Sequence, residues 1–292
     1  MTMEYGIQPP AYRLPDETRL GAVHLQVSDL NRSLDFYQQT MGLRVASRDG
    51  SRASLAPQGD GDALVWLTAR HGVRPVPRQG LLGLYHFAIL LPDRPALGRF
   101  LQHLSEIGAY TGTADHFVSE SVYLTDPDGL GIEVYADRPR TAWRHHQRQL
   151  YMTTDRLDVR AVVASAGGVS WDGMPAGTVM GHVHLHVGDL DRAAAFYHAA
   201  LGFDKVVWEY PGALFLSAGG YHHHLGTNTW SSGPPASEED ARLLTWEIVV
   251  PSTPDAAAAA ASLNGAGYRA SETDQGWIAN DPWGTTLQLR GA

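Results

Sequence analysis

Apolar and polar residues alternate in two short stretches of the chain, residues 23–27 and 183–187. A period of two predicts strands that are buried on one face. Each stretch leads into an aspartate and an amphipathic segment that runs to a glycine, residues 29–42 and 189–202. Such segments are typical of helices that begin at an N-cap and end at glycine. The two regions therefore predict the same order of elements.

These regions are copies of one another. Residues 21–43 align with residues 181–203 at a constant offset of 160. A weaker match aligns DPDGLGIEV at 126–134 with DPWGTTLQL at 281–289, at an offset of 155. Internal similarity of this kind indicates a repeated unit, here of about 140 residues.

Each copy divides again into two units. Further strands are predicted over residues 84–91 and 243–250, each followed by a proline and a helical segment, residues 95–107 and 254–264. Short strands and turns follow each predicted helix. We therefore predict an α+β fold of four strand–helix–three-strand (βαβββ) units.

The repeat also suggests domain boundaries. We predict an N-terminal tail at residues 1–18 and a first domain at 19–137, each domain holding two units. A linker at 138–178, polar and then glycine-rich, separates it from a second domain at 179–292.

Composition removes several classes of function. Lys and Arg number 22 against 31 Asp and Glu, a net charge of −9 without a basic block, so we expect no nucleic-acid partner. No apolar stretch approaches the roughly 20 residues of a membrane span, and the N-terminus does not look like a signal peptide. Because the chain lacks cysteine, thiolate sites are excluded and we expect a cytoplasmic protein. Assembly into a homo-oligomer is left open.

Candidate chemistry is concentrated at the end of the second unit. A histidine, an aliphatic residue with tyrosine, an acidic residue with proline and glycine, and a glutamate follow at short spacing: His116, Val122, Tyr123, Asp126, Pro127, Gly129 and Glu133. The Asp-Pro-Asp-Gly segment alone would be a turn on any fold. The chemistry therefore depends on the His, Tyr and Glu around it.

This pattern resembles the motif of extradiol ring-cleaving dioxygenases. The segments 29–42 and 189–202 each contain an Asp-Leu pair followed by a Phe-Tyr pair. This pattern resembles the vicinal oxygen chelate superfamily, which includes those enzymes, glyoxalase I and bleomycin-resistance proteins. The resemblance implies two glyoxalase/bleomycin-resistance/dioxygenase-type barrels. It also implies extradiol cleavage of a catechol-type aromatic diol by O₂, as in the catechol 2,3-dioxygenase subgroup. The cofactor would be iron(II), with Mn, Zn or Ni as alternatives.

By the same resemblance, Glu133 is a metal ligand, while His116 and Tyr123 act on the substrate. Two histidines and one carboxylate on one face of iron(II) leave open positions for a catecholate and O₂. The family takes the two histidines from the first strands of two units. In the four units of this chain, the first-strand positions are Ala22, His86, His182 and Thr245. The last-strand position is Glu133 in the second unit and Gln288 in the fourth.

Only pairing of the second unit with the third gives a complete set, His86, His182 and Glu133. We therefore predict one metal site that links the two halves, with His24 as the alternative to His182. A second cavity without metal is expected around His24, Trp246 and Gln288.

Strand alternation assigns further side chains to the substrate pocket. His184 and His186 share a face with His182, and Tyr135 shares one with Glu133. We expect these side chains to line the pocket.

Two other histidine groups stand apart from this strand. In the run at residues 222–224 the alternation pairs His222 with His224. We expect His222 at the pocket and His224 in proton transfer. His145 and His146, in the linker, are expected to be solvated.

Two other functions compete with ring cleavage. A glyoxalase-type isomerase would use a related metal site, normally with a second carboxylate. A metal-free binding protein similar to bleomycin-resistance proteins would hold a flat ligand between aromatic walls, for which the chain offers eight tryptophans. A complete two-His-one-Glu set has no purpose in such a binder, which favours the dioxygenase.

Overall fold

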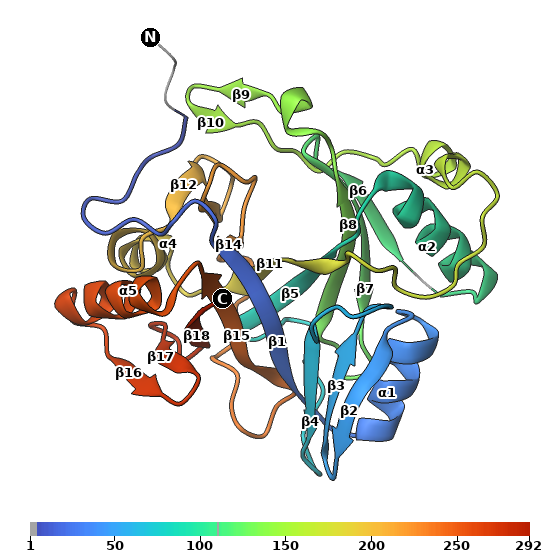
Figure 1. Ribbon diagram of the computed structural model, residues 1–292, viewed down its shortest axis with the longest axis horizontal. Coiled ribbons are helices and arrows are strands. Elements are labelled where there is room, and N and C mark those ends of the chain that lie inside the picture. The colour runs from blue at the N-terminus through green and yellow to red at the C-terminus, as the bar shows by residue number, and fades with distance from the viewer. Residues whose placement is uncertain (1–4, 110) are drawn as a thin grey trace.

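The computed structural model describes residues 5–109 and 111–292, which form two curled eight-stranded sheets (Figure 1). The α+β arrangement of four βαβββ units is confirmed. The first two units comprise β1 (Arg19–Val27), α1 (Leu30–Gln39), β2 (Arg44–Asp49), β3 (Arg52–Ala56) and β4 (Val65–Ala69), then β5 (Gly83–Leu90), α2 (Arg94–Glu106), β6 (Gly112–Asp115), β7 (Ser119–Thr125) and β8 (Gly131–Asp137).

The third and fourth units repeat this order with one difference. The predicted helix at 189–202 starts as α4 (Leu190–Ala193) and continues as the π-helix η2 (Ala194–Ala200). The remaining elements are β11 (Val179–His186), β12 (Asp204–Val207), β13 (Ala213–Ser217) and β14 (Leu225–Asn228), then β15 (Arg242–Val250), α5 (Thr253–Gly265), β16 (Ala270–Thr273), β17 (Gly276–Asn280) and β18 (Thr286–Gly291).

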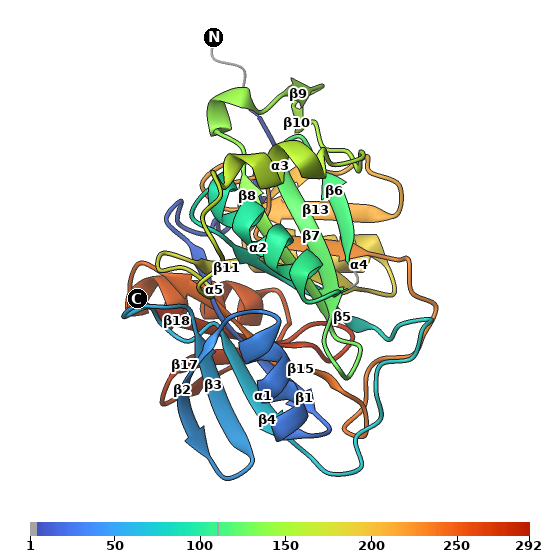
Figure 2. The ribbon, with the colours of Figure 1, turned by 90° about the vertical axis from the view of Figure 1, so that its right-hand side faces the viewer.

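Each sheet takes one unit from each half of the sequence. Strand β5 of the second unit pairs antiparallel with β11 of the third, and β1 of the first pairs antiparallel with β15 of the fourth. In Figure 2 the strands β6, β7 and β8 lie in the upper part and β1–β4 in the lower part. The predicted pairing of the second unit with the third is confirmed, and neither half forms a sheet by itself.

Hydrogen bonds between tyrosine and aspartate connect the first unit to the second and the third unit to the fourth. Tyr197, from the repeated Phe-Tyr pair, donates to Asp281 Oδ2 at 2.9 Å, and Tyr37 donates to Asp126 Oδ2 at 3.4 Å. Each bond runs from the helix of one unit to the turn before the last strand of the next unit. All four side chains are buried. The two repeated motifs of the sequence therefore contact one another inside each half.

The segments predicted as tail and linker carry structure of their own. Residues 1–4 of the tail lie outside the described residues, but Leu14 is buried and its N–H donates to the Gly202 carbonyl. The linker contains the short elements η1 (Arg140–Ala142), β9 (His145–His146), β10 (Gln149–Leu150) and α3 (Val159–Ser165). His145 and His146 are exposed, as expected. Within the described residues, no helix is long and apolar enough to cross a membrane.

The sheet pairing predicts that the first half does not fold as a monomer. In a chain ending at Arg140, β1 and β5 lose β15 and β11, which leaves unpaired backbone groups beside an apolar face. We expect aggregation or self-association in size-exclusion chromatography, and recovery of a folded complex when residues 141–292 are co-expressed. A monomeric fragment with a cooperative urea transition would contradict this pairing.

Candidate metal centre

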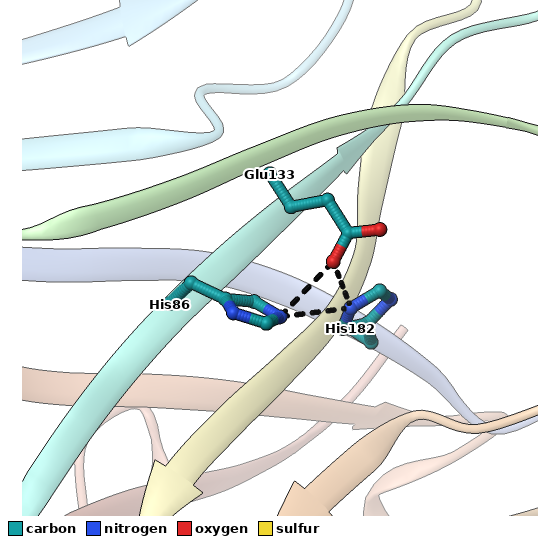
Figure 3. Close-up of side chains that lie close together, drawn as sticks. All are labelled: His86, Glu133 and His182. Carbon is teal, nitrogen blue, oxygen red and sulfur yellow. Dashed lines mark hydrogen bonds and ion pairs between the residues drawn. The ribbon is translucent and has the colours of Figure 1, made fainter. Parts of the chain in front are cut away.

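Three buried side chains meet at one point of the sheet that the second and third units form (Figure 3). His86 Nε2 lies 3.0 Å from Glu133 Oε2, and His182 Nε2 lies 3.1 Å from the same oxygen. The two imidazole nitrogens are 3.3 Å apart. The cluster predicted from the sequence is thus brought together by the fold.

Strand register explains this convergence. Strand β5 lies between β11 and β8, and Ala88 on β5 is the register partner of both His182 and Glu133. His86 lies two residues before Ala88 and so shares its face. Because the alanine side chain is small, the three longer side chains can meet above it.

The spacing of the three atoms fits a divalent metal. Bonds of about 2.1 Å at right angles place neighbouring ligand atoms about 3.0 Å apart, and tetrahedral angles place them about 3.4 Å apart. The separations of 3.0, 3.1 and 3.3 Å lie between these limits. Two imidazoles and one carboxylate on one face also match the ligand set of non-haem iron(II) oxygenases, which leaves positions open.

The surroundings favour the protonation state that a metal requires. Burial raises the pKa of Glu133, but charge interactions and hydrogen bonds with His182 and His86 outweigh it and hold that pKa well below its usual range. Burial lowers the pKa of His182 to about 4. An ionised carboxylate and a neutral imidazole at neutral pH are ready to bind a cation without losing protons.

Ser121 orients the carboxylate. Its hydroxyl donates to Glu133 Oε1 at 2.6 Å, which leaves Oε2 for the two histidines. Ser121 lies on β7, two residues before Tyr123, and is fully buried. A hydrogen bond of this kind fixes the direction of a ligand and is a usual part of metal sites. The sequence motif gave no signal for this serine, because it lies inside the variable stretch between His116 and Tyr123.

A cavity of about 290 Å³ opens beside the cluster. This is at the lower end of the range for small-molecule sites, about 300–1,000 Å³. Its walls combine the three clustered side chains with aromatic rings and with residues of the linker: Tyr85, His86, Gly112, Thr113, Ala114, His116, Tyr123, Glu133, Met152, Thr153, Thr154, His182, His184, Tyr210, Phe215, His223 and Trp230. A flat ligand would therefore lie between aromatic walls.

His116 and Tyr123 form a hydrogen-bonded pair in this wall. His116 Nδ1 lies 2.6 Å from the Thr153 carbonyl, which can only accept, so Nδ1 carries the proton. In the neutral ring Nε2 then accepts, and the Tyr123 hydroxyl donates to it at 2.6 Å. Burial and the charge of Glu133 raise the pKa of Tyr123 well above its usual range, so the phenol stays protonated. The pair presents the phenol oxygen to the cavity with its proton directed away.

The other histidines predicted for the pocket divide between two cavities. His184 lines the cavity beside the cluster. His186 lines an adjoining cavity, whose wall shares Tyr85 and Tyr123 with the first, and its Nδ1 lies 2.6 Å from Asn228 Oδ1. Of the two, His184 contacts a member of the cluster, with its ring centroid 5.1 Å from that of His86.

The prediction for residues 222–224 needs correction. His223, not His222 or His224, lines the cavity. His224 Nδ1 lies 3.2 Å from both the Ser217 hydroxyl and the Ala218 N–H, away from the cluster, so its expected role in proton transfer does not fit this position. The alternation rule failed because these residues form a turn before β14, and side chains alternate only in extended strands.

Tyr135 also lies outside the cavity wall. It shares a strand face with Glu133, as expected, but its hydroxyl hydrogen-bonds the Tyr221 hydroxyl at 2.7 Å and its ring packs against His182. A side chain at Gly181 would collide with this hydroxyl, so the glycine of the repeat makes room for Tyr135. Tyr135 therefore supports His182 rather than lining the pocket.

The second cavity lies in the other sheet and contains His24 and Gln288. The expected place of Trp246 there is wrong: Trp246 is fully buried in the core, while its neighbours Thr245 and Glu247 face the cavity. His24 Nε2 lies 3.4 Å from Glu247 Oε1, and its strand β1 belongs to a different sheet from β8, which carries Glu133. Among the described residues, the set of His86, Glu133 and His182 is the one with metal-ligand spacing.

Comparison with known proteins agrees with this architecture. The sequence model of the glyoxalase/bleomycin resistance protein/dioxygenase superfamily matches residues 19–134 and 179–289. A catechol-2,3-dioxygenase of Bacillus subtilis (strain 168) is 41% identical over 272 residues, which are 91% of this chain and 95% of that protein.

Solved structures share the fold at lower identity. The cppA protein of Streptococcus pneumoniae TIGR4 superposes with a TM-score of 0.58 at 12% identity, over 94% of this chain and 98% of that one. Glyoxalase I from Zea mays has a TM-score of 0.57 at 18% identity, over 94% and 92%.

The cluster predicts which histidine controls metal binding. His182→Ala should weaken iron(II) binding by more than about 100-fold, because even residues outside the ligand set typically contribute 10–100-fold. His24→Ala, a matched change at the first strand of the other sheet, should leave the affinity unchanged. Anaerobic equilibrium dialysis with metal analysis measures both. Loss of iron from the His24 variant alone would show that the site is assigned to the wrong sheet.

Proposed function

The chain belongs to the glyoxalase/bleomycin resistance protein/dioxygenase superfamily, and we propose that it is an extradiol dioxygenase that opens a catechol-type aromatic diol beside its hydroxyl groups with O₂. One observation carries the proposal: a buried set of two histidines and one glutamate faces a small cavity with aromatic walls. The 41% identity to a catechol-2,3-dioxygenase supports it. We also propose that the protein is located in the cytoplasm, because the chain has no cysteine and so no disulfide.

We assign iron(II) as the cofactor and His86, Glu133 and His182 as its ligands, with Mn, Zn or Ni as the alternative metals. When bound, iron(II) supplies the electron exchange that lets a singlet catechol react with triplet O₂ and favours the deprotonated form of the diol. Ser121 keeps Glu133 directed at the ligand position. Burial of all three side chains excludes water that would compete with the substrate.

The remaining residues of the cavity bind the ring and handle its protons. Tyr85, Phe215 and Trp230 provide flat apolar surfaces of the kind that stack on an aromatic ring. The Tyr123 hydroxyl donates its hydrogen bond to His116, so its oxygen can accept a hydrogen bond from a substrate hydroxyl. His223, from the third unit, also lines the cavity. The substrate hydroxyls would thus meet polar side chains from two units.

The two competing functions lack support from the cavity. A glyoxalase-type isomerase would normally need a second carboxylate, and Glu133 is the one acidic side chain among the described residues that line this cavity. A metal-free binder has no need of two histidines and one glutamate buried at ligand spacing beside its cavity. The expected set of tryptophan walls is also reduced, since Trp230 lines this cavity while Trp66 and Trp277 line the other.

The reaction itself is the direct test. Protein reconstituted anaerobically with iron(II) should consume O₂ in a 1:1 ratio with a catechol and form a yellow ring-fission product, measured with an oxygen electrode and by absorbance. A panel of substituted catechols gives the substrate preference. If the loaded protein oxidises none of them but isomerises a thiohemiacetal, the proposal is wrong and the glyoxalase alternative replaces it.

Proton handling gives an independent prediction. Tyr123→Phe and His116→Ala should each lower kcat by about 10²–10⁴-fold, the usual effect of removing an acid–base group. Iron content should stay at the wild-type level, because neither side chain belongs to the clustered set. Iron lost from the His116 variant would mean that His116 is itself a ligand.

A further inference from the structure

Behind the cavity wall formed by His223, a series of polar contacts leads through buried histidines to the half-buried Asp137. His223 Nδ1 lies 2.8 Å from His222 Nδ1, and His222 Nε2 lies 2.9 Å from Asp137 Oδ1. His222 is fully buried, and His223 is 5% exposed. No residue of this series belongs to the clustered set. The contacts therefore require an explanation of their own.

With a neutral His222, the hydrogen bonding capacity of the three groups leaves one arrangement. Asp137, as a carboxylate, can only accept, so His222 Nε2 carries a proton. In a neutral imidazole the other nitrogen then accepts, so His222 Nδ1 is unprotonated. His223 Nδ1 faces that nitrogen at hydrogen bond distance and must donate to it. His223 Nε2 is left unprotonated.

The position of His223 gives this arrangement a use. Its ring packs on His182 with centroids 4.0 Å apart and contacts Phe215, so it lies beside both the cluster and the aromatic wall. Because Nδ1 is directed at His222, Nε2 is the ring nitrogen available to the cavity. We propose that Asp137 and His222 are positioning residues that fix the tautomer of His223, so that Nε2 faces the cavity as a hydrogen bond acceptor. Its benefit to ring cleavage rests on the proposed function.

His116 offers an internal comparison. The Thr153 carbonyl fixes the proton of His116 on Nδ1 in a single step, which also leaves Nε2 as an acceptor. For His223 the same result needs two steps, through His222 to a carboxylate. His116 and His223, which belong to two different units, therefore have the same ring nitrogen unprotonated.

The series connects β8 with the turn before β14. Asp137 is the last residue of β8 and lies on the face that carries Glu133 and Tyr135. His222 and His223 lie in the turn before β14, and β14 is separated from β8 by β11 and β5. The His222 side chain nevertheless reaches Asp137 across them. Asp137 Oδ1 also accepts from the Tyr221 hydroxyl at 3.2 Å, which holds the carboxylate from a second side.

The tautomer can be observed directly. We would measure ¹⁵N NMR of the histidine rings in the full chain loaded with zinc(II), which has a filled d shell and is therefore diamagnetic. The signals would be assigned with His222→Asn and His223→Asn variants. We expect His223 to be protonated at Nδ1 and unprotonated at Nε2, and His222 the reverse. A protonated Nε2 on His223 would overturn the inference.

Two variants test the part played by Asp137. Asp137→Ala should give His223 a mixture of tautomers and lower kcat of the iron-loaded protein by about 10–100-fold, as typically follows removal of a partner that orients a functional imidazole. KM and iron content should be unchanged. Tyr221→Phe is the matched control, because it removes the other donor to the same carboxylate oxygen; it should keep the tautomer of His223. An unchanged tautomer in Asp137→Ala would show that the carboxylate is only structural.

The measurements separate failure of this inference from failure of the proposed function. A reversed tautomer in a protein that cleaves catechols overturns the inference alone. The expected tautomer in a protein that consumes no O₂ with any catechol overturns the proposed function alone.

Discussion

The antiparallel pairing of β5 with β11 is the contact on which the site depends. It places the first strands of the second and third units side by side, and with β8 on the other edge of β5 it forms the row Glu133, Ala88, His182. A buried carboxylate needs partners, since leaving it alone in the interior is strongly unfavourable. Ser121 and His86 come from the same half as Glu133, but His182 reaches it only while strands from both halves are paired. The complete metal site therefore requires the folded whole chain.

Repetition made most of the fold predictable. The matching segments at offsets of 160 and 155 fixed the order of elements in all four units, and the ligand positions could then be compared unit by unit. Only one pairing of units gave two histidines and a glutamate, and the sheet order agrees with it. Tyr197 and Asp281 show why such motifs repeat, because each needs the other across the interior. Because the same tyrosine–aspartate contact is needed in both halves, its motifs recur in the sequence and can be recognised there.

Most of what the sequence did not reveal lies where no strand or helix sets the direction of a side chain. Residues 222–224 form a turn, so the alternation that chose His224 had no physical basis there and His223 was missed. Thr153 acts through its backbone carbonyl, which has no signature in the sequence. Trp246 was misplaced by a single position on β15, which is enough to move a side chain to the opposite face.

The crossed pattern of connections has a consequence for the origin of the chain. Sheets join the second unit to the third and the first to the fourth, while tyrosine–aspartate bonds join the first to the second and the third to the fourth. A polypeptide of half this length could build the same arrangement only by pairing with an identical copy, and symmetry would then give it two equal sites. Fusion into one chain releases that symmetry. One site can keep His86, His182 and Glu133, while the other drifts to Thr245, Ala22 and Gln288 and becomes free to serve a different purpose.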